Sequence, residues 1–332
     1  MTRKVLVING DNYGRTVIGA AEKVLRSVAP DLEIVHGKMG AEAYESTGYA
    51  MPPATMDLIT ECDAMLVGPL DMKGVPERDP LAAIQKQMGL YLQYREYFPL
   101  CDYLGKGSVD VVVLSPAPDS TMVVHETESI DGISSEEYTD SDRLREMLSE
   151  TLKICELKDG RKISAVADGI LFKSRESRVD EVLGQFFADT EFRVKRTSTG
   201  EMLYTMVQHG AEPAILLCDI PSAACIQGLA AGIVGGSGLM PCGYLGRNLK
   251  LFTVAPIYHT EAVGRELNPT SAILSAACML LTFGMDREYQ LIRSAVCEMY
   301  RSGRTTPDVG GHLSADKFAQ GVNEIIHMNM HS

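Results

Sequence analysis

Short apolar runs alternate with amphipathic stretches along the first 70 residues, and this alternation limits the fold more than any other feature. Residues 4–10, 32–35 and 64–70 are predicted to be buried strands, and residues 17–28 carry apolar side chains at helical spacing. Apolar strands separated by helices are typical of a parallel sheet that is covered on both faces. The sequence therefore predicts an α/β fold.

The alternation continues through the rest of the chain. It predicts a long helix over 79–98, a helix over 144–157, a buried helix over 268–284, and strands over 110–116, 162–172, 214–220 and 249–257. An acidic segment over 125–142 interrupts the pattern. Its composition is that of a solvated excursion, and a projecting arm that makes a dimer contact is the alternative.

Length and charge restrict the domain count and the partners. A chain of 332 residues exceeds what one hydrophobic core usually serves, so two lobes are expected. A net charge of −13 and a pI near 5.0 argue against nucleic acid or an anionic membrane as partner. The first residues of the chain enter a predicted strand directly and show no signal peptide, and no apolar run is long enough to span a membrane. These two observations predict a cytoplasmic protein.

The eight cysteines include no CxxC pair, and several lie in apolar runs. We expect them to be reduced thiols of the core, where cysteine behaves as a small apolar residue. The seven histidines show no spacing that would place two of them on one metal. A structural zinc site is not expected.

Six segments, taken in order and with their spacing, closely resemble the isocitrate/isopropylmalate dehydrogenase family. The segments are GDNYG (10–14), CDAMLVGP (62–69), MGLYLQYR (88–95), AAGIVGGSGLMP (230–241), NPTSAILSAACMLLTFG (268–284) and RTTPDVGGHLSADKFAQGV (304–322). The resemblance implies two α/β domains with parallel or mixed sheets. The larger domain would comprise 1–99 plus 251–332, and the smaller one, 100–250, would carry an arm that interlocks with a second subunit.

The family oxidises and decarboxylates 2-hydroxy acids with NAD(P)⁺ and a divalent metal. The resemblance places two metal-binding aspartates one helical turn apart, and here those positions hold Ala224 and Gly228. The third carboxylate, which reaches across from the partner subunit, falls at Gly200. Because none of these residues carries a side-chain oxygen, no divalent metal is expected.

The substrate-binding positions also differ from the family pattern. Of three arginines that bind substrate carboxylates in the family, the first aligns with Gln85, the second with Arg95 and the third with Ser115. Arg95 is therefore the one predicted substrate-binding residue, on a helix that faces the cleft. The position of the proton-carrying lysine falls at Ala167, followed by Asp168.

The nucleotide side keeps more of the family pattern. Glu261 matches the acidic residue that holds the ribose hydroxyls, and Gly264, Asn268 and Asp308 match other cofactor-binding positions. No lysine or arginine stands at the ribose position. The resemblance therefore favours NAD or an adenosine nucleotide over NADP as the cofactor, if one binds.

Three classes of function remain open. The first is a catalytically degenerate relative that binds a small molecule as a homodimer, or that regulates an active paralogue in a hetero-oligomer. The second is a redirected enzyme that uses the same cleft without metal on a carboxylate or phosphate substrate, with Asp168, Tyr258 and His259 as candidate acid–base residues. The third is a divergent NAD-dependent dehydrogenase. For each candidate residue, an ordinary surface position is the alternative.

Overall fold

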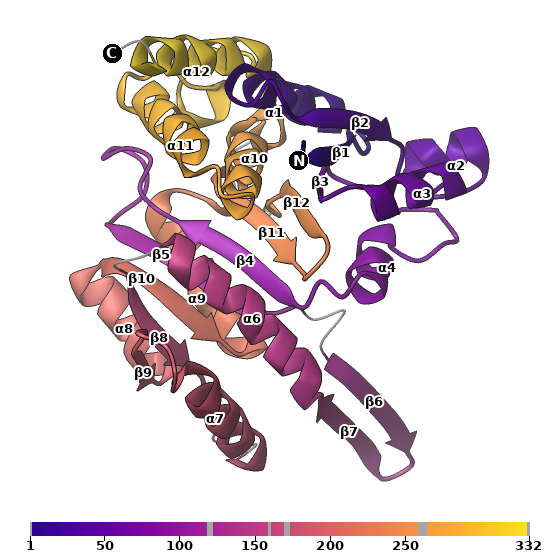
Figure 1. Ribbon diagram of the computed structural model, residues 1–332, viewed down its shortest axis with the longest axis vertical. Helices are drawn as coiled ribbons and strands as arrows, with labels where there is room; N and C mark the ends of the chain where they lie inside the picture. Colours follow the sequence, from indigo (N-terminus) through magenta and orange to yellow (C-terminus); the bar gives the residue numbers. More distant parts are fainter. Residues whose placement is uncertain (1, 118–121, 159–160, 169–172, 258–263, 331–332) are drawn as a thin grey trace.

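One ten-stranded sheet runs through the molecule, with helices on both of its faces (Figure 1). The computed structural model describes residues 2–117, 122–158, 161–168, 173–257 and 264–330. The first elements are β1 (Lys4–Ile8), α1 (Gly14–Val28), β2 (Glu33–Gly37), α2 (Ala41–Thr47), α3 (Pro53–Glu61), β3 (Ala64–Val67), α4 (Pro80–Gln87), β4 (Leu92–Tyr97), β5 (Val109–Pro116), β6 (Met122–Ser129) and β7 (Gly132–Thr139).

The second half of the chain contributes the remaining strands and most of the long helices. In order they are α6 (Ser141–Leu157), β8 (Lys162–Val166), α7 (Lys173–Phe187), β9 (Val194–Thr197), α8 (Thr199–His209), β10 (Ala211–Cys218), α9 (Ile220–Val234), β11 (Pro241–Leu245), β12 (Lys250–Val254), α10 (Thr270–Thr282), α11 (Asp286–Arg301) and α12 (Ala315–Met330). Short 3-10 helices lie at Ser237–Leu239, Arg265–Leu267 and Pro307–Val309.

The strand order is β2-β1-β3-β12-β11-β4-β5-β10-β8-β9. Both outer parts of the sheet are parallel, which confirms the α/β prediction. The centre is different, because β12, β11, β4 and β5 pair antiparallel with one another. The sheet is therefore mixed, and its antiparallel centre joins two parallel parts.

The strands contribute to a separate apolar core on each face of the sheet. In β1, Val5 and Val7 belong to the core beneath α1 and α10, whereas Leu6 and Ile8 belong to the core beneath α3. This alternation follows from the two-residue period of a strand. It explains why β1 is apolar at each successive position from Val5 to Ile8.

The prediction of one long helix over 79–98 is wrong. Helix α4 ends at Gln87, Gly89 adopts a left-handed conformation with φ of +64°, and β4 begins at Leu92. Glycine tolerates this conformation, and the amide of Leu90 donates to the carbonyl of Gln85 in a helix-ending bond of 2.9 Å. Arg95 consequently lies on a central strand, not on a helix.

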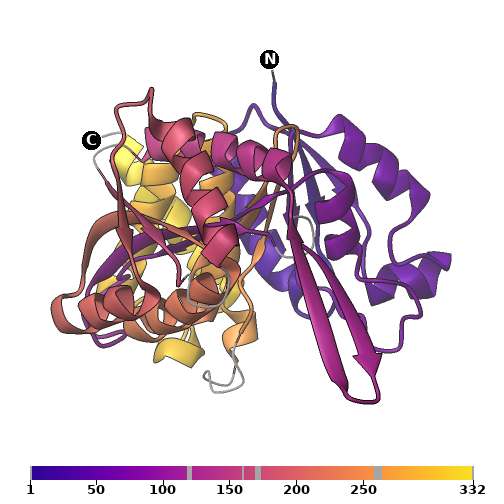
Figure 2. The same ribbon diagram turned by 90° about the horizontal axis from the view of Figure 1, so that it is seen from below.

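The acidic segment folds as the two-stranded ribbon β6–β7, which pairs antiparallel from Met122 to Thr139. The ribbon projects from the body of the molecule (Figure 2). Ile130 and Ile133 near its tip are exposed. The projecting-arm alternative therefore describes the shape of this segment, while its role in a dimer stays a prediction.

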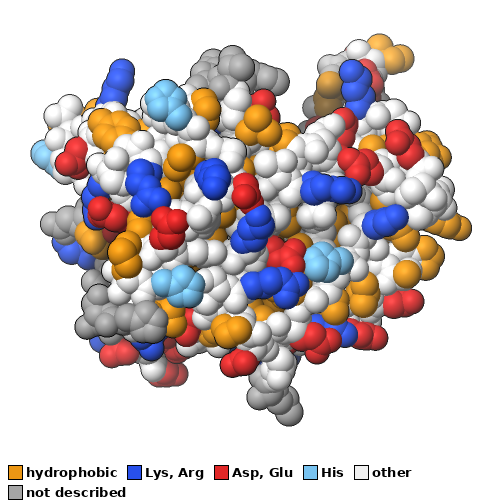
Figure 3. Space-filling view, turned by 90° about the horizontal axis from the view of Figure 1, so that it is seen from above, with side chains coloured by type: hydrophobic (Ala, Val, Ile, Leu, Met, Phe, Trp, Pro, Cys, Tyr) orange, Lys and Arg blue, Asp and Glu red, His pale blue; other side chains and the backbone are white. Residues whose placement is uncertain are grey.

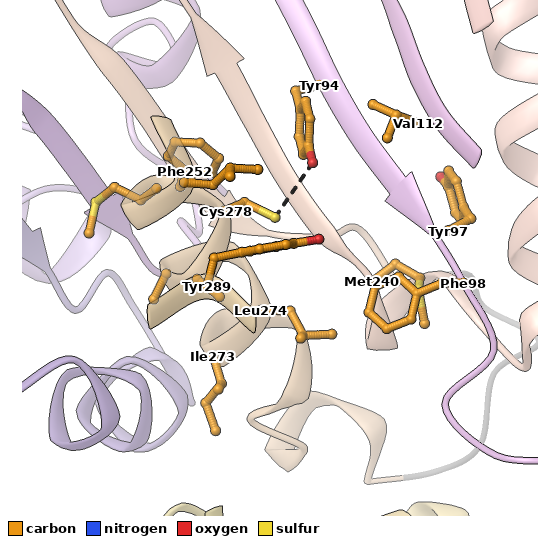
Figure 4. Packing of buried hydrophobic residues seen from close by; sticks show 14 of the residues in the cluster. Tyr94, Tyr97, Phe98, Val112, Met240, Phe252, Ile273, Leu274, Cys278 and Tyr289 are labelled. Carbon is orange, nitrogen blue, oxygen red and sulfur yellow. Dashed lines mark hydrogen bonds between the residues drawn. The ribbon is translucent and has the colours of Figure 1, made fainter. Parts of the chain in front are cut away.

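A charged cluster lies inside the core beside β4. The carboxylate of Glu96 has no solvent exposure, and it accepts hydrogen bonds from Lys158 Nζ at 3.0 Å, Tyr289 OH at 2.8 Å and Tyr94 OH at 2.8 Å. Tyr94, Tyr289 and Cys278 point toward one another in this region (Figure 4). A buried carboxylate needs such partners because desolvation opposes its charge.

The cluster continues from Glu96 toward β5 and β8. Arg293 Nη2 lies 3.6 Å from Asp110 Oδ2, and Arg161 Nη2 lies 2.7 Å from Asp110 Oδ1. The guanidinium of Arg293 also stacks 4.0 Å from the ring centre of Phe98. These contacts tie α11 to the central strands of the sheet.

All eight cysteines are free thiols and all except Cys225 are buried, which confirms the expectation of core thiols. Among the described residues no helix combines the length and the apolar character needed to cross a membrane. On the face above α1 and α12, positive and negative side chains are interspersed (Figure 3). A surface of this kind differs from the basic patch that nucleic acid requires.

Candidate functional site

Helix α9 carries the positions that the resemblance assigns to a metal. The Asp219 carboxylate accepts a hydrogen bond of 2.8 Å from the amide of Ser222 and so caps the start of the helix. The helix then presents Ala224 and Gly228 one turn apart, and Gly200 lies exposed on the neighbouring α8. Methyl and hydrogen substituents cannot coordinate a divalent cation, so this donor set does not fit Mg²⁺ or Mn²⁺.

The wider surroundings do not supply a replacement set of ligands. Across the ranges that the structure describes, no three His, Cys, Asp or Glu side chains gather in a metal-binding group. Asp219 is engaged as the cap of α9. The Asp168 carboxylate accepts from the amide of Thr199 at 3.3 Å, near the start of α8.

Arg95 lies in the middle of β4, opposite Cys242 of β11 and Val113 of β5. It is 7% exposed, so its guanidinium is largely removed from water. Successive strand residues face opposite sides of the sheet, and therefore Arg95 shares a face with Gln93 and not with Glu96. This is the side on which α9 packs, because Gln227 of α9 donates a hydrogen bond to Gln93.

A row of neutral polar side chains crosses the antiparallel centre of the sheet beside Arg95. Tyr244, Gln93 and Ser115 are direct neighbours in register on β11, β4 and β5. Gln93 Oε1 accepts from Ser115 Oγ at 3.2 Å and from Gln227 Nε2 of α9 at 3.1 Å, and Gln93 Nε2 donates to Tyr244 OH at 3.4 Å. We call these four residues the neutral row.

Gln85, at the first substrate-arginine position, is also buried, with 3% exposure. Its side-chain oxygen makes no hydrogen bond with any described residue. Leaving a buried amide oxygen without a donor costs about 1–3 kcal/mol. Among the three positions that correspond to the family's arginines, Arg95 is thus the one that keeps a positive charge.

The structure brings together two of the predicted cofactor residues. Asn268 Nδ2 donates to Asp308 Oδ2 at 3.0 Å and to Tyr300 OH at 3.2 Å, and Asn268 Oδ1 accepts from the amide of Thr270 at 3.0 Å. Arg265 Nε lies 3.1 Å from the same Asp308 oxygen. Both amide hydrogens of Asn268 are engaged, so an adenine ring could contact that amide only if this network opened.

Other predicted residues are separate from this network or outside the described ranges. Gly264 starts the short 3-10 helix before Asn268 with φ of +85°, which suits glycine. Tyr258, His259 and Glu261 lie outside the described residues. Asp168 is exposed and accepts its hydrogen bond from Thr199 at the start of α8.

Sequence reasoning missed the neutral row because it placed Gln93 and Arg95 on a helix. The alternation Leu92, Tyr94 and Glu96 against Gln93 and Arg95 is a period-two pattern that would have indicated a strand. The contact of Gln227 with Gln93 joins residues far apart in the chain, and no local pattern predicts it.

Comparisons with known proteins identify the family to which the chain belongs. The model of the family described as isocitrate/isopropylmalate dehydrogenase matches residues 4–155 and 178–325. The chain is similar to 3-isopropylmalate dehydrogenase of Archaeoglobus fulgidus, with 26% identity over 98% of this chain and 99% of the relative. It is also similar to isocitrate/homoisocitrate dehydrogenase of Thermus thermophilus, with 24% identity over 98% of this chain and 99% of the relative.

Solved structures show the same fold. A β-decarboxylating dehydrogenase of Thermococcus kodakarensis superimposes with a TM-score of 0.86 at 20% identity, covering 99% of this chain and 98% of that chain. Isocitrate dehydrogenase of Methylococcus capsulatus gives a TM-score of 0.81 at 20% identity, with coverages of 98% and 99%. The match of the family model along most of the chain carries the assignment. The chain belongs to the isocitrate/isopropylmalate dehydrogenase family.

Proposed function

We propose that this chain is a catalytically degenerate member of its family, which binds a small molecule or regulates a partner without metal-dependent oxidative decarboxylation. One observation carries the proposal: α9 presents Ala224 and Gly228 where the family's chemistry needs two carboxylates. Gly200, which stands at the third ligand position, provides no ligand either. No arrangement of these three residues can hold a divalent cation.

The size of the expected loss supports this reading over a weakened enzyme. Removing one acid–base group typically lowers a rate by about 10²–10⁴. A metal that polarises the reacting oxygens contributes several kcal/mol of transition-state stabilisation in addition. Ala167 at the lysine position and Ala224 at a metal position remove both contributions together.

Thermal melting with nucleotides tests what the protein binds. We would measure the melting temperature with NAD⁺, NADP⁺, NADH and AMP, each with and without Mg²⁺ or Mn²⁺. A ligand at 100 times its dissociation constant adds about 2.7 kcal/mol to stability, which shifts melting by several degrees. A shift that requires the metal would contradict the proposal, whereas a metal-independent shift or none agrees with it.

A redirected enzyme without metal is the second candidate, and Arg95 is the observation that favours it. A buried arginine at a substrate-binding position can still orient one carboxylate or phosphate. The candidate acid–base groups have less support, because Asp168 is exposed and engaged with Thr199. Turnover of a carboxylate substrate that Arg95→Gln abolishes and EDTA leaves intact would favour this candidate.

The assembly that we propose is a dimer through α8 and α9, either with a second copy or with an active paralogue. Tyr204 and Val207 of α8 are each 63% exposed, and Cys225 is exposed on the neighbouring helix α9. Large apolar side chains exposed on adjacent helices are typical of an interaction surface. The projecting ribbon β6–β7 would add the interlocking arm that the family resemblance implies.

A further inference from the structure

The sheet consists of two parallel parts that meet at strands β11 and β4. The first part is β2-β1-β3-β12, and α1, α10, α11 and α12 pack together beside it (Figure 1). The second part is β5-β10-β8-β9, with α6, α7, α8 and α9. The chain passes between the parts only through β4 and β11. The orientation of one part relative to the other therefore depends on the contacts between them.

The buried carboxylate of Glu96 contacts side chains of both parts. It lies on β4, between the parts. From α11 of the first part, Tyr289 OH donates to Glu96 Oε1 at 2.8 Å, and Arg293 Nε lies 4.0 Å from the same oxygen. From the end of α6 in the second part, Lys158 Nζ lies 3.0 Å from that oxygen as well. One carboxylate oxygen thus links α11 to α6.

Two further contacts join the parts directly. Lys158 Nζ donates to Tyr289 OH, and Arg293 Nη2 lies 3.6 Å from Asp110 Oδ2 on β5. Arg161, just before β8, holds the other Asp110 oxygen at 2.7 Å. Apart from the pairs of Glu96, the other ion pairs between described residues each stay within one part. The charged contacts between the parts are therefore concentrated in this cluster.

Burial makes these contacts resistant to movement. The side chain of Glu96 has no solvent exposure and that of Lys158 is 6% exposed. If one part shifted against the other, these charges would separate in a region where water cannot replace the lost partner, which is strongly unfavourable. Apolar side chains of both parts also share one continuous core, but apolar attraction is non-directional and fixes no particular orientation.

We infer that Glu96, Lys158, Tyr289, Arg293 and Asp110 form a latch that fixes the two parts of the sheet to one another. Because the latch joins them, the two parts open as one cooperative unit, and the molecule presents the surfaces of both in one fixed relative geometry. The inference goes beyond the proposed function and does not rest on it, since the latch requires neither a ligand nor a metal.

Native-state hydrogen–deuterium exchange, followed by mass spectrometry, measures whether the parts open together. Leu25 is fully buried on α1, so Leu25→Ala creates a cavity in the first part, far along the sheet from β8 and β10. In an otherwise wild-type chain we expect this substitution to accelerate exchange of the slowest amides of β1 at least about tenfold. The slowest amides of β8 and β10 should accelerate by a similar factor, because latched parts open together.

A double variant removes the latch without leaving an unpaired charge at either position. Glu96→Gln/Lys158→Met removes both charges of the pair and keeps side chains of similar length. In this background Leu25→Ala should still accelerate exchange in β1 at least about tenfold, but should change exchange in β8 and β10 less than about twofold. The matched control is Glu61→Gln/Lys4→Met, which removes an exposed pair of 2.8 Å within the first part and should leave the wild-type coupling intact.

Two results would overturn the inference. If Leu25→Ala accelerated exchange only in the first part of the wild-type chain, the parts would already be independent. If it accelerated exchange in β8 and β10 equally in both backgrounds, the shared apolar core would couple the parts without the latch. Should the double variant fail to fold, Asp110→Asn, which breaks the direct pair with Arg293, provides the same comparison. None of these outcomes bears on metal-dependent activity, so the latch and the proposed function can fail separately.

Discussion

At the scale of single residues, Glu96 is a fully buried carboxylate that contacts two cationic side chains and two tyrosine hydroxyls. Replacing it by glutamine leaves Lys158 buried without its carboxylate and leaves Arg293 with Asp110 alone. Breaking a buried ion pair from one side costs about 3–5 kcal/mol, and we expect Glu96→Gln to lower the free energy of unfolding by about that amount. Urea denaturation of the variant and the wild type measures the difference.

A matched control exists on the surface. Glu61 pairs with Lys4 at 2.8 Å, a distance similar to that of the buried pair, but its side chain is 59% exposed. Solvent screens such a pair, so Glu61→Gln should change stability little. If both variants unfolded at the same urea concentration as the wild type, the buried cluster would not stabilise the fold as we infer.

The same carboxylate predicts how stability depends on pH. Burial alone would raise the pKa of Glu96, but Lys158, Arg293 and the hydrogen bond from Tyr94 outweigh it and lower that pKa from 4.5 to about 2. A folded pKa below the unfolded one means that the stabilisation is complete above pH 4.5 and is lost as pH falls toward 2.

Wild-type protein should therefore lose on the order of 3 kcal/mol more than Glu96→Gln between those pH values. Thermal unfolding of both proteins in a pH series measures this difference. Parallel curves for the two proteins would show that Glu96 is not the group responsible.

At the scale of elements, the apolar runs of the sequence predict strands β1, β2, β3, β5, β10 and β12 and helices α1, α6 and α10 within a few residues of their bounds. Strand β1 and helix α1 were recognisable because their apolar residues have one clear period each. The prediction of one helix over 79–98 failed because Gly89 separates helix α4 from strand β4. The polar residues of that strand, Gln93 and Arg95, resemble the polar face of a helix. The period-two alternation of β4 and its pairing with β11 and β5 distinguish the strand from a helix.

The paired helices α8 and α9 carry the prediction about assembly. Tyr204→Asp places a charge within the exposed apolar face of α8, and we expect it to raise the dissociation constant of the dimer at least about tenfold. Tyr49→Asp changes a tyrosine of comparable exposure, 53% against 63%, on the loop after α2 and should leave the dimer intact. Light scattering over a concentration series compares the two variants.

The same light-scattering experiment distinguishes this interface from two alternatives. Wild-type protein that is monomeric throughout would contradict a homodimer and leave the hetero-oligomer with a paralogue as the assembly to examine. A dimer that Tyr204→Asp leaves unchanged would place the interface elsewhere, for example on the ribbon β6–β7 alone.

At the scale of the whole molecule, the fold could be predicted from the sequence, but the arrangement of the candidate site could not. Six short segments in order indicated the family, and the family model and the solved structures agree. The identities of Ala224 and Gly228 also follow from sequence alone. The neutral row does not, because Gln93, Ser115, Gln227 and Tyr244 come from four separate elements that only the folded sheet brings together.

The network around Asn268 shows a second limit of sequence reasoning. Asn268 and Asp308 match cofactor positions, yet the structure shows them bonded to each other and to Arg265. A matched residue can serve packing as well as binding, and a sequence does not distinguish the two. The division into domains 1–99 plus 251–332 and 100–250 likewise stays a prediction, since one sheet passes through both parts.

The most direct test of the central claim is a spectrophotometric assay of NAD⁺ and NADP⁺ reduction with isocitrate, isopropylmalate and homoisocitrate, with Mg²⁺ or Mn²⁺ present. The 3-isopropylmalate dehydrogenase of Archaeoglobus fulgidus, 26% identical to this chain, is a suitable positive control. We predict no reduction above the rate without protein, because Ala224, Gly228 and Gly200 provide no ligand for the metal. Reduction that depends on both protein and metal with any of the three substrates would contradict the account.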